Sequence, residues 1–340
     1  MRLTRILRYS SLSILLAATC ISASAQGINK RPQSKVTIKQ TATTASRSKE
    51  TKWTDTKALK KAKKKSTATA ATQPAQPAPK PAEPAKKIDF HASYRIPTLD
   101  IDNEAAGLSA DECYEMGDRY FFGTDETPKN ETLAAQWYQK AANEGHTLGE
   151  HDLAYCCING IGTEKDFDKA YHWYNLSASK DNFDSQMMVG EMYLKGLGVK
   201  YNPTKASEWY RKAAVQGYMP AQAMLAYCLS NGEGVIQDFE EANKWYLEAA
   251  TQGDIESAYQ LGLSFLNGEG VEKDYTEAAK WLEHAAANDH LEAQYLFADL
   301  VLRGRGVEED QDRFIELLKD AARKGHEKSQ NRLTRIDETW

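Results

Sequence analysis

Tryptophan recurs at a fixed interval of 36 residues through the C-terminal two thirds of the chain. Five tryptophans keep this interval and a leucine takes the sixth place: Trp137, Trp173, Trp209, Trp245, Trp281 and Leu317. Two small residues follow each of these positions four and five places later, from Ala141–Ala142 to Ala321–Ala322. A fixed period of about 20 to 50 residues is typical of repeat architectures, in which each unit buries its apolar face against the next. The chain is therefore constrained to a stack of six similar units.

Each unit carries the helix-capping residues typical of a helical hairpin. A glycine pair is expected to end the first helix, because glycine reaches positive φ without Cβ strain; the pairs are Gly160/Gly162, Gly196/Gly198, Gly232/Gly234, Gly268/Gly270 and Gly304/Gly306. An Asn or Asp then predicts the N-cap of the second helix in all six units: Asn130, Asp166, Asn202, Asp238, Asp274 and Asp310. Glutamates three residues after Asp238 and Asp274 predict capping boxes, as does Glu112 after Ser109. The tryptophans and alanines are predicted to form the core.

The glycine loops do not indicate a nucleotide site. A phosphate-binding loop follows a strand and usually continues with Gly-Lys-Ser/Thr, and neither feature accompanies these glycines. The unit instead resembles the Sel-like repeat (SLR) family over about residues 109–325. That resemblance implies an all-α fold: a right-handed α/α superhelical solenoid of six 36-residue helix-turn-helix repeats plus a C-terminal capping helix. The expected boundaries are about 109–146, 147–182, 183–218, 219–254, 255–290 and 291–326, with the capping helix at 327–337. The resemblance also implies an adaptor or recognition surface without catalytic residues.

Residues 1–25 have the pattern of a secretory signal peptide. Three arginines precede an apolar run from Leu12 to Ile21, and the small residues Ala-Ser-Ala lead to a cleavage site after Ala25. Lipidation at Cys20 is the alternative. Neither this run nor any later segment predicts a transmembrane helix, which needs about 20 apolar residues. We therefore expect an exported protein of the periplasm or the cell exterior.

Residues 26–105 predict a disordered linker. Residues 26–89 carry 16 basic and 4 acidic side chains, a net charge of +12, with few large apolar residues to offset ordering entropy. Residues 90–340 carry 24 basic and 44 acidic side chains, a net charge of −20. Export and the acidic array argue against nucleic acid as the partner of the lysines. An anionic envelope polymer is the partner that the lysine-rich linker favours.

No residue pattern predicts catalysis, a cofactor or a metal. Cys113, Cys156, Cys157 and Cys228 lack the CxxC spacing of redox or zinc sites, and they are expected to be small buried helix residues, although export permits disulfides. His146 and His151 are five residues apart and do not share a helical face. The acidic residues are scattered, so nothing singles out the carboxylate pair of a cell-wall-acting enzyme.

A variable stripe on the first helices is the candidate binding surface. It lies nine, five and two residues before the first glycine of each pair, at the i, i+4, i+7 spacing of one helical face. We expect it to face the concave surface and to bind a protein or peptide, because tyrosine gives large contact area at interfaces; packing between neighbouring first helices is the alternative. The predicted contact residues are Tyr155, Glu191, Tyr227, Tyr259, Tyr295 and Asp299. The predicted function is a non-enzymatic, exported interaction scaffold, and the alternative is a glycan- or polymer-binding envelope protein.

Overall fold

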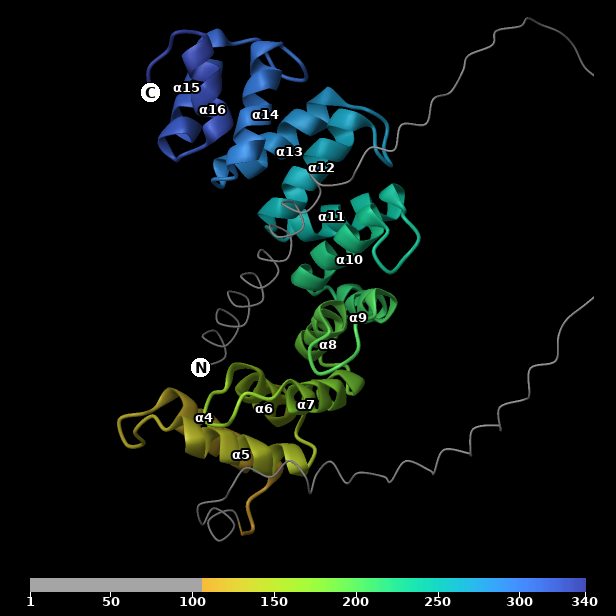
Figure 1. Ribbon diagram of the computed structural model, residues 1–340, viewed down its shortest axis with the longest axis vertical. Helices are drawn as coiled ribbons and strands as arrows, with labels where there is room; N and C mark the ends of the chain where they lie inside the picture. The colour runs from red at the N-terminus through yellow and green to blue at the C-terminus, as the bar shows by residue number, and fades with distance from the viewer. Residues whose placement is uncertain (1–105) are drawn as a thin grey trace, which may run out of the picture. The chain divides into compact units, whose positions relative to one another are not determined.

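The computed structural model describes residues 106–340, and regular secondary structure in that range is entirely α-helical (Figure 1). The helices are α4 (Ala110–Phe122), α5 (Glu131–Asn143), α6 (Thr147–Asn159), α7 (Phe167–Ser179), α8 (Phe183–Lys195), α9 (Pro203–Val215), α10 (Met219–Asn231), α11 (Phe239–Thr251), α12 (Ile255–Asn267), α13 (Tyr275–Ala287), α14 (Leu291–Leu302), α15 (Gln311–Arg323) and α16 (Glu327–Arg335). The signal peptide predicted at 1–25 and the linker predicted at 26–105 lie outside the described residues.

The helices form six hairpins that pack in chain order. Each even-numbered helix from α4 to α14 pairs with the helix that follows it, and each hairpin contacts the next one. Helix α16 packs on α15 and closes the array. The prediction of an all-α solenoid of six helical hairpins with a capping helix is therefore confirmed. Between residues 106 and 340, no helix is both long and apolar enough to cross a bilayer.

Asn or Asp caps every second helix, as predicted. In all six hairpins the side-chain oxygen of this residue accepts a hydrogen bond from a backbone amide of the first turn. The capping box at Ser109 and Glu112 forms both of its bonds. The box predicted at Asp238 and Glu241 forms one, because the Glu241 carboxylate instead accepts hydrogen bonds from Arg211 and Trp245.

The two glycines of each loop have different roles, a distinction that the sequence did not reveal. The first glycine caps its helix in the left-handed conformation at the ends of α6, α8, α10 and α12. The second glycine lies against the preceding hairpin. A Cβ atom at Gly234 would lie 2.1 Å from the carbonyl oxygen of Pro203, the first residue of α9, and a Cβ at Gly198 would lie 2.0 Å from that of Phe167. Equivalent close approaches occur at Gly162, Gly270 and Gly306.

The residue after each tryptophan, or after Leu317 in the sixth hairpin, occupies the constant core position. This residue is buried in all six hairpins: Tyr138, Tyr174, Tyr210, Tyr246, Leu282 and Leu318. It packs over a small residue of the first helix, and a Cβ at Gly190 would lie 2.5 Å from the Tyr210 ring.

The predicted burial of the indoles was only partly right. Trp137 and Trp173 are buried, at 1% and 0% exposure, whereas Trp209, Trp245 and Trp281 are half-buried at the edge of the core. One residue turns a helix by about 100°, so the tyrosine points inward and the indole lies on the flank. There the Lys212 ammonium lies 3.7 Å from the Trp209 ring centroid.

Replacing the second glycine of a loop should cost far more stability than replacing a glycine with free space around it. Gly217 has φ +86° and no atom within 4 Å of the place that a Cβ would occupy, whereas Gly234 has φ +73° and meets the Pro203 backbone. We expect Gly217→Ala to cost about 1 kcal/mol for the left-handed backbone, and Gly234→Ala to cost at least ~2 kcal/mol more for the clash. Urea unfolding followed by circular dichroism measures both, and equal losses would contradict the proposed contact.

Candidate functional site

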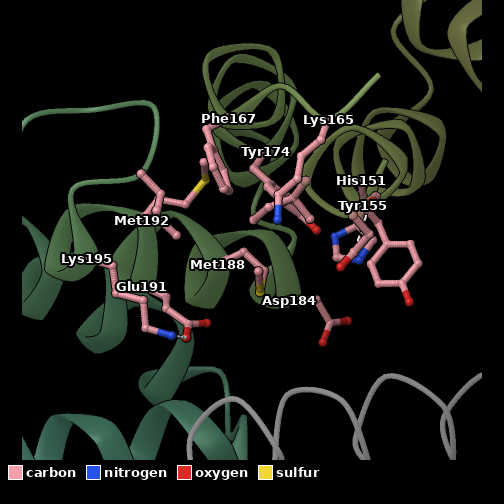
Figure 2. Close-up of a pocket in the computed structure, with 13 residues that line it drawn as sticks. His151, Tyr155, Lys165, Phe167, Tyr174, Asp184, Met188, Glu191, Met192 and Lys195 are labelled. Atoms are coloured by element: carbon pink, nitrogen blue, oxygen red, sulfur yellow. Dashed lines mark hydrogen bonds and ion pairs between the residues drawn. The ribbon is translucent and has the colours of Figure 1, made fainter. Parts of the chain in front are cut away.

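A cavity of about 240 Å³ lies between α6, α7 and α8, where the second and third hairpins meet (Figure 2). It is lined by His151, Tyr155, Ile158, Asn159, Lys165, Phe167, Tyr174, Asp184, Met188, Glu191, Met192, Lys195 and Leu197. Pockets that enclose whole small-molecule ligands usually measure about 300–1,000 Å³. The cavity is therefore of a size for one large side chain rather than for a cofactor.

The lining combines an apolar wall with a charged side. Phe167 and Met192 project from one direction, and His151 and Tyr155 lie across the cavity from them (Figure 2). The Glu191 carboxylate is largely buried and forms an ion pair with Lys195. Asp184 is half-buried and has no ion-pair partner among residues 106–340. Methionine side chains adapt to varied apolar shapes, and the Asp184 carboxylate favours a cation beside the apolar group.

A chain of hydrogen bonds fixes the His151 ring. The Thr147 carbonyl accepts from Ser177 Oγ at 2.9 Å, and Ser177 Oγ accepts from Ser185 Oγ at 2.9 Å. The Ser185 hydroxyl has thereby used its proton, so it accepts from His151 Nδ1 at 2.8 Å. In a serine hydrolase the histidine accepts the serine proton. Here the direction is reversed and Ser185 is buried, so this pair holds the cavity wall and does not form a nucleophile.

The four cysteine thiols of the described array are unsuited to nucleophilic chemistry. Cys113, Cys156, Cys157 and Cys228 are buried, as predicted, and all four are free thiols. Burial raises the pKa of Cys157 to about 12 and that of Cys228 to about 12. A thiol is nucleophilic as the thiolate, so both remain inert near neutral pH. In the part of the chain from residue 106 onward, no three His, Cys, Asp or Glu side chains are arranged to hold a metal ion.

The structure separates the six predicted contact residues into different settings. Tyr155 and Glu191 line the cavity. Tyr227 is half-buried on α10, outside the lining, and Asp299 forms an ion pair with Arg303 at 2.7 Å. Whether the stripe contacts a partner stays a prediction, and the structure provides a cavity at its α6 and α8 positions.

Tyr259 and Tyr295 lie at junctions between hairpins. The Tyr259 ring stacks on the His290 ring with centroids 4.3 Å apart, and Tyr295 lies 5.6 Å from His326. Packing between neighbouring first helices, the alternative role for the stripe, therefore accounts for these two tyrosines at least in part. His290 Nε2 also lies 3.3 Å from a Glu256 carboxylate oxygen of the preceding hairpin.

The histidines at these junctions are N-caps of first helices, a role that the sequence alone did not suggest. His146 Nδ1 accepts from the Gly149 amide at 2.9 Å, and His290 Nδ1 accepts from the Ala293 amide at 3.0 Å. Asn182 and Asp254 cap the equivalent helices in other hairpins with their side-chain oxygens. The sequence did contain a signal for this role. The histidines occupy the repeat position at which other hairpins have Asn or Asp, and these two residues are common N-caps.

Nine lining residues lie outside the predicted stripe, among them Phe167, Asp184 and Met188. Phe167 begins a second helix, whereas the stripe was drawn from first helices alone. Met188 and Asp184 lie on α8 one and three residues away from the stripe position Met187. Their convergence depends on how α8 packs beside α6 and α7, which the period of a single helix does not define.

The repeat pattern matches a known family. The Sel1 repeat model matches six consecutive segments, 113–146, 147–182, 183–218, 220–254, 255–290 and 291–326. The chain belongs to the Sel1 repeat family. Sel1 repeats generally mediate protein–protein interaction and are not catalytic.

Two solved Sel1-type structures resemble this chain. The first is c5321, described as a protective antigen present in uropathogenic Escherichia coli strains displaying an SLR fold, with 34% identity and a TM-score of 0.65. That match covers 69% of this chain and 50% of c5321, so the chain spans half the length of the antigen. The second is a Sel1 repeat protein from Oxalobacter formigenes, with 27% identity, a TM-score of 0.57 and coverage of 66% and 87%. No curated protein matches the chain.

Acidification should weaken the junction between the sixth Sel1 repeat and the capping helix. Burial of Glu292 opposes its ionisation, but hydrogen bonds from Lys328 and His326 outweigh burial, so its pKa lies below the ordinary 4.5. A lowered pKa stabilises the fold fully above that ordinary value, and the stabilisation is lost as pH falls through the folded-state pKa. We expect the melting temperature of Glu292→Gln to fall less than that of the unaltered chain between pH 5 and pH 3. If thermal scans show that the melting temperatures of the variant and the unaltered chain fall equally, Glu292 has no such role.

Proposed function

We propose that the chain is a non-enzymatic adaptor that binds a partner peptide across α6, α7 and α8, with one large side chain of the peptide in the cavity. The family supplies the general role in protein–protein interaction. The observation that supports this position is the cavity itself, in which Tyr155, Phe167 and Met188 surround a space of about 240 Å³. A buried anchor in a well-packed pocket commonly dominates the energy of an interface.

Filling the cavity should abolish peptide binding while the array remains folded. Met188 is half-buried in the lining, and Leu296 is the matched half-buried residue of the sixth hairpin, outside the lining. We expect random dodecapeptides selected on the intact chain to share a large apolar residue. Their affinity, measured by fluorescence anisotropy, should fall at least tenfold in Met188→Arg and stay unchanged in Leu296→Arg, with helicity verified by circular dichroism. Equal affinity for both variants would place peptide binding elsewhere.

Export is a further part of the proposal. The pattern of residues 1–25 supports it, and so does the similarity to c5321, which is described as a protective antigen. We propose that the mature chain begins at Gln26 in the periplasm or outside the cell, with lipidation at Cys20 as the alternative. Mass spectrometry of the mature chain distinguishes the two, and an intact N-terminus in the cytoplasm would refute both.

A role in binding an anionic envelope polymer is the second candidate. The net charge of +12 in residues 26–89 favours it, since the array from residue 106 to 340 carries 23 basic and 41 acidic side chains. Deleting residues 30–87 discriminates the two roles. Salt-sensitive retention on isolated envelopes should vanish on deletion if the polymer is the partner, and peptide binding at the cavity should persist.

A further inference from the structure

We propose that the cavity between α6, α7 and α8 is occupied within the same chain by the segment 88–101, with Tyr94 as the inserted side chain. The inference rests on the proposed function, because it assigns an internal occupant to the same cavity. It makes the segment a built-in competitor that an external peptide must displace. Three observations support it: the composition of the segment, the reach of the chain, and the chemistry of the cavity.

The segment differs in composition from the chain before it. Residues 88–101 read IDFHASYRIPTLDI and contain six large apolar side chains in 14 residues. Residues 26–87 contain five in 62 residues, namely Ile28, Val36, Ile38, Trp53 and Leu59. Exposure of apolar side chains to water is unfavourable, so a short apolar segment next to a repeat array needs a surface to cover it. The lysine-rich residues before it have few apolar side chains to cover.

The chain is long enough for the contact. Eleven residues, 95–105, connect Tyr94 to Ala106, where the described structure begins just ahead of α4. An extended chain advances about 3.3–3.6 Å per residue, so these residues span roughly 40 Å. An α-helix with its side chains is only about 10–12 Å wide, and the cavity begins at α6, one hairpin after α4. Tethering over this length gives an effective concentration on the order of millimolar, which favours the internal segment over a free peptide.

The chemistry of the cavity fits the Tyr94–Arg95 pair. An aromatic ring suits a space of about 240 Å³ lined by Phe167 and Met192. The neighbouring Arg95 would bring a guanidinium to the side on which Asp184 lies (Figure 2). Asp184 has no ion-pair partner within the described part of the chain, and arginine binds carboxylates with two parallel hydrogen bonds. The segment therefore offers both the apolar and the cationic groups that the lining favours.

Photo-crosslinking in the full chain tests the placement. With Tyr94 replaced by the photoreactive amino acid p-benzoylphenylalanine, irradiation should give crosslinks within one chain to residues of the lining, mapped by mass spectrometry. The yield should fall at least tenfold when Met188→Arg is added and stay unchanged with Leu296→Arg. Crosslinks between chains, or crosslinks spread evenly over the array, would overturn the proposal.

Competition provides an independent measurement that does not require Met188→Arg to fold. A fluorescent peptide of residues 88–101 is titrated into the intact chain and into the chain with Phe90→Ser and Tyr94→Ser. We expect at least tenfold tighter binding to the variant, because its cavity has lost the internal competitor. Equal affinity, or no binding to either chain, refutes the internal occupant. Selected dodecapeptides that still bind at the cavity would leave the proposed function standing. Failure of both the 88–101 peptide and the dodecapeptides to bind the Phe90→Ser and Tyr94→Ser chain would remove both.

Discussion

Direct contact between the backbones of neighbouring hairpins sets the spacing of the whole array. At the second glycine of the loops in the second to sixth hairpins, the chain passes so near the first residue of the preceding second helix that a Cβ atom would overlap a carbonyl group. Side chains can adjust their rotamers, but two backbone segments in contact cannot. Each loop thereby holds its own hairpin at a fixed distance from the one before it. The 36-residue period of the sequence reflects the recurrence of this contact in successive hairpins.

The cavity arises where the fixed spacing meets side chains that vary between repeats. Gly198 contacts the backbone of Phe167, and the Phe167 ring is part of the cavity lining. The same junction carries the hydrogen-bonded chain from Thr147 through Ser177 and Ser185 to His151. A rigid frame with adaptable methionines in its opening suits recognition of a side chain.

The hairpins could be predicted from the chemistry of single helix ends. Features that depend on contacts among several helices could not. Asn202 as an N-cap and Gly196 as a C-cap each follow from the rules of a single helix end, and both were predicted. Tyr210 and Trp209 are adjacent apolar residues, and only the direction of the neighbouring helix decides that the tyrosine occupies the core. Similarly, Tyr155 was found from its variable position on one helix, while Phe167 required knowledge of how α7 lies beside α6. The cavity depends on three helices, and no single period encodes it.

The central claim is that backbone contact at the loop glycines holds neighbouring hairpins in place and so forms the cavity. A crystal structure of the chain carrying Gly198→Ala tests it most directly. The account predicts that the loop after α8 withdraws from the start of α7, with Phe167 displaced from the cavity wall. An unchanged loop with the alanine accommodated beside an unmoved Phe167 would contradict it.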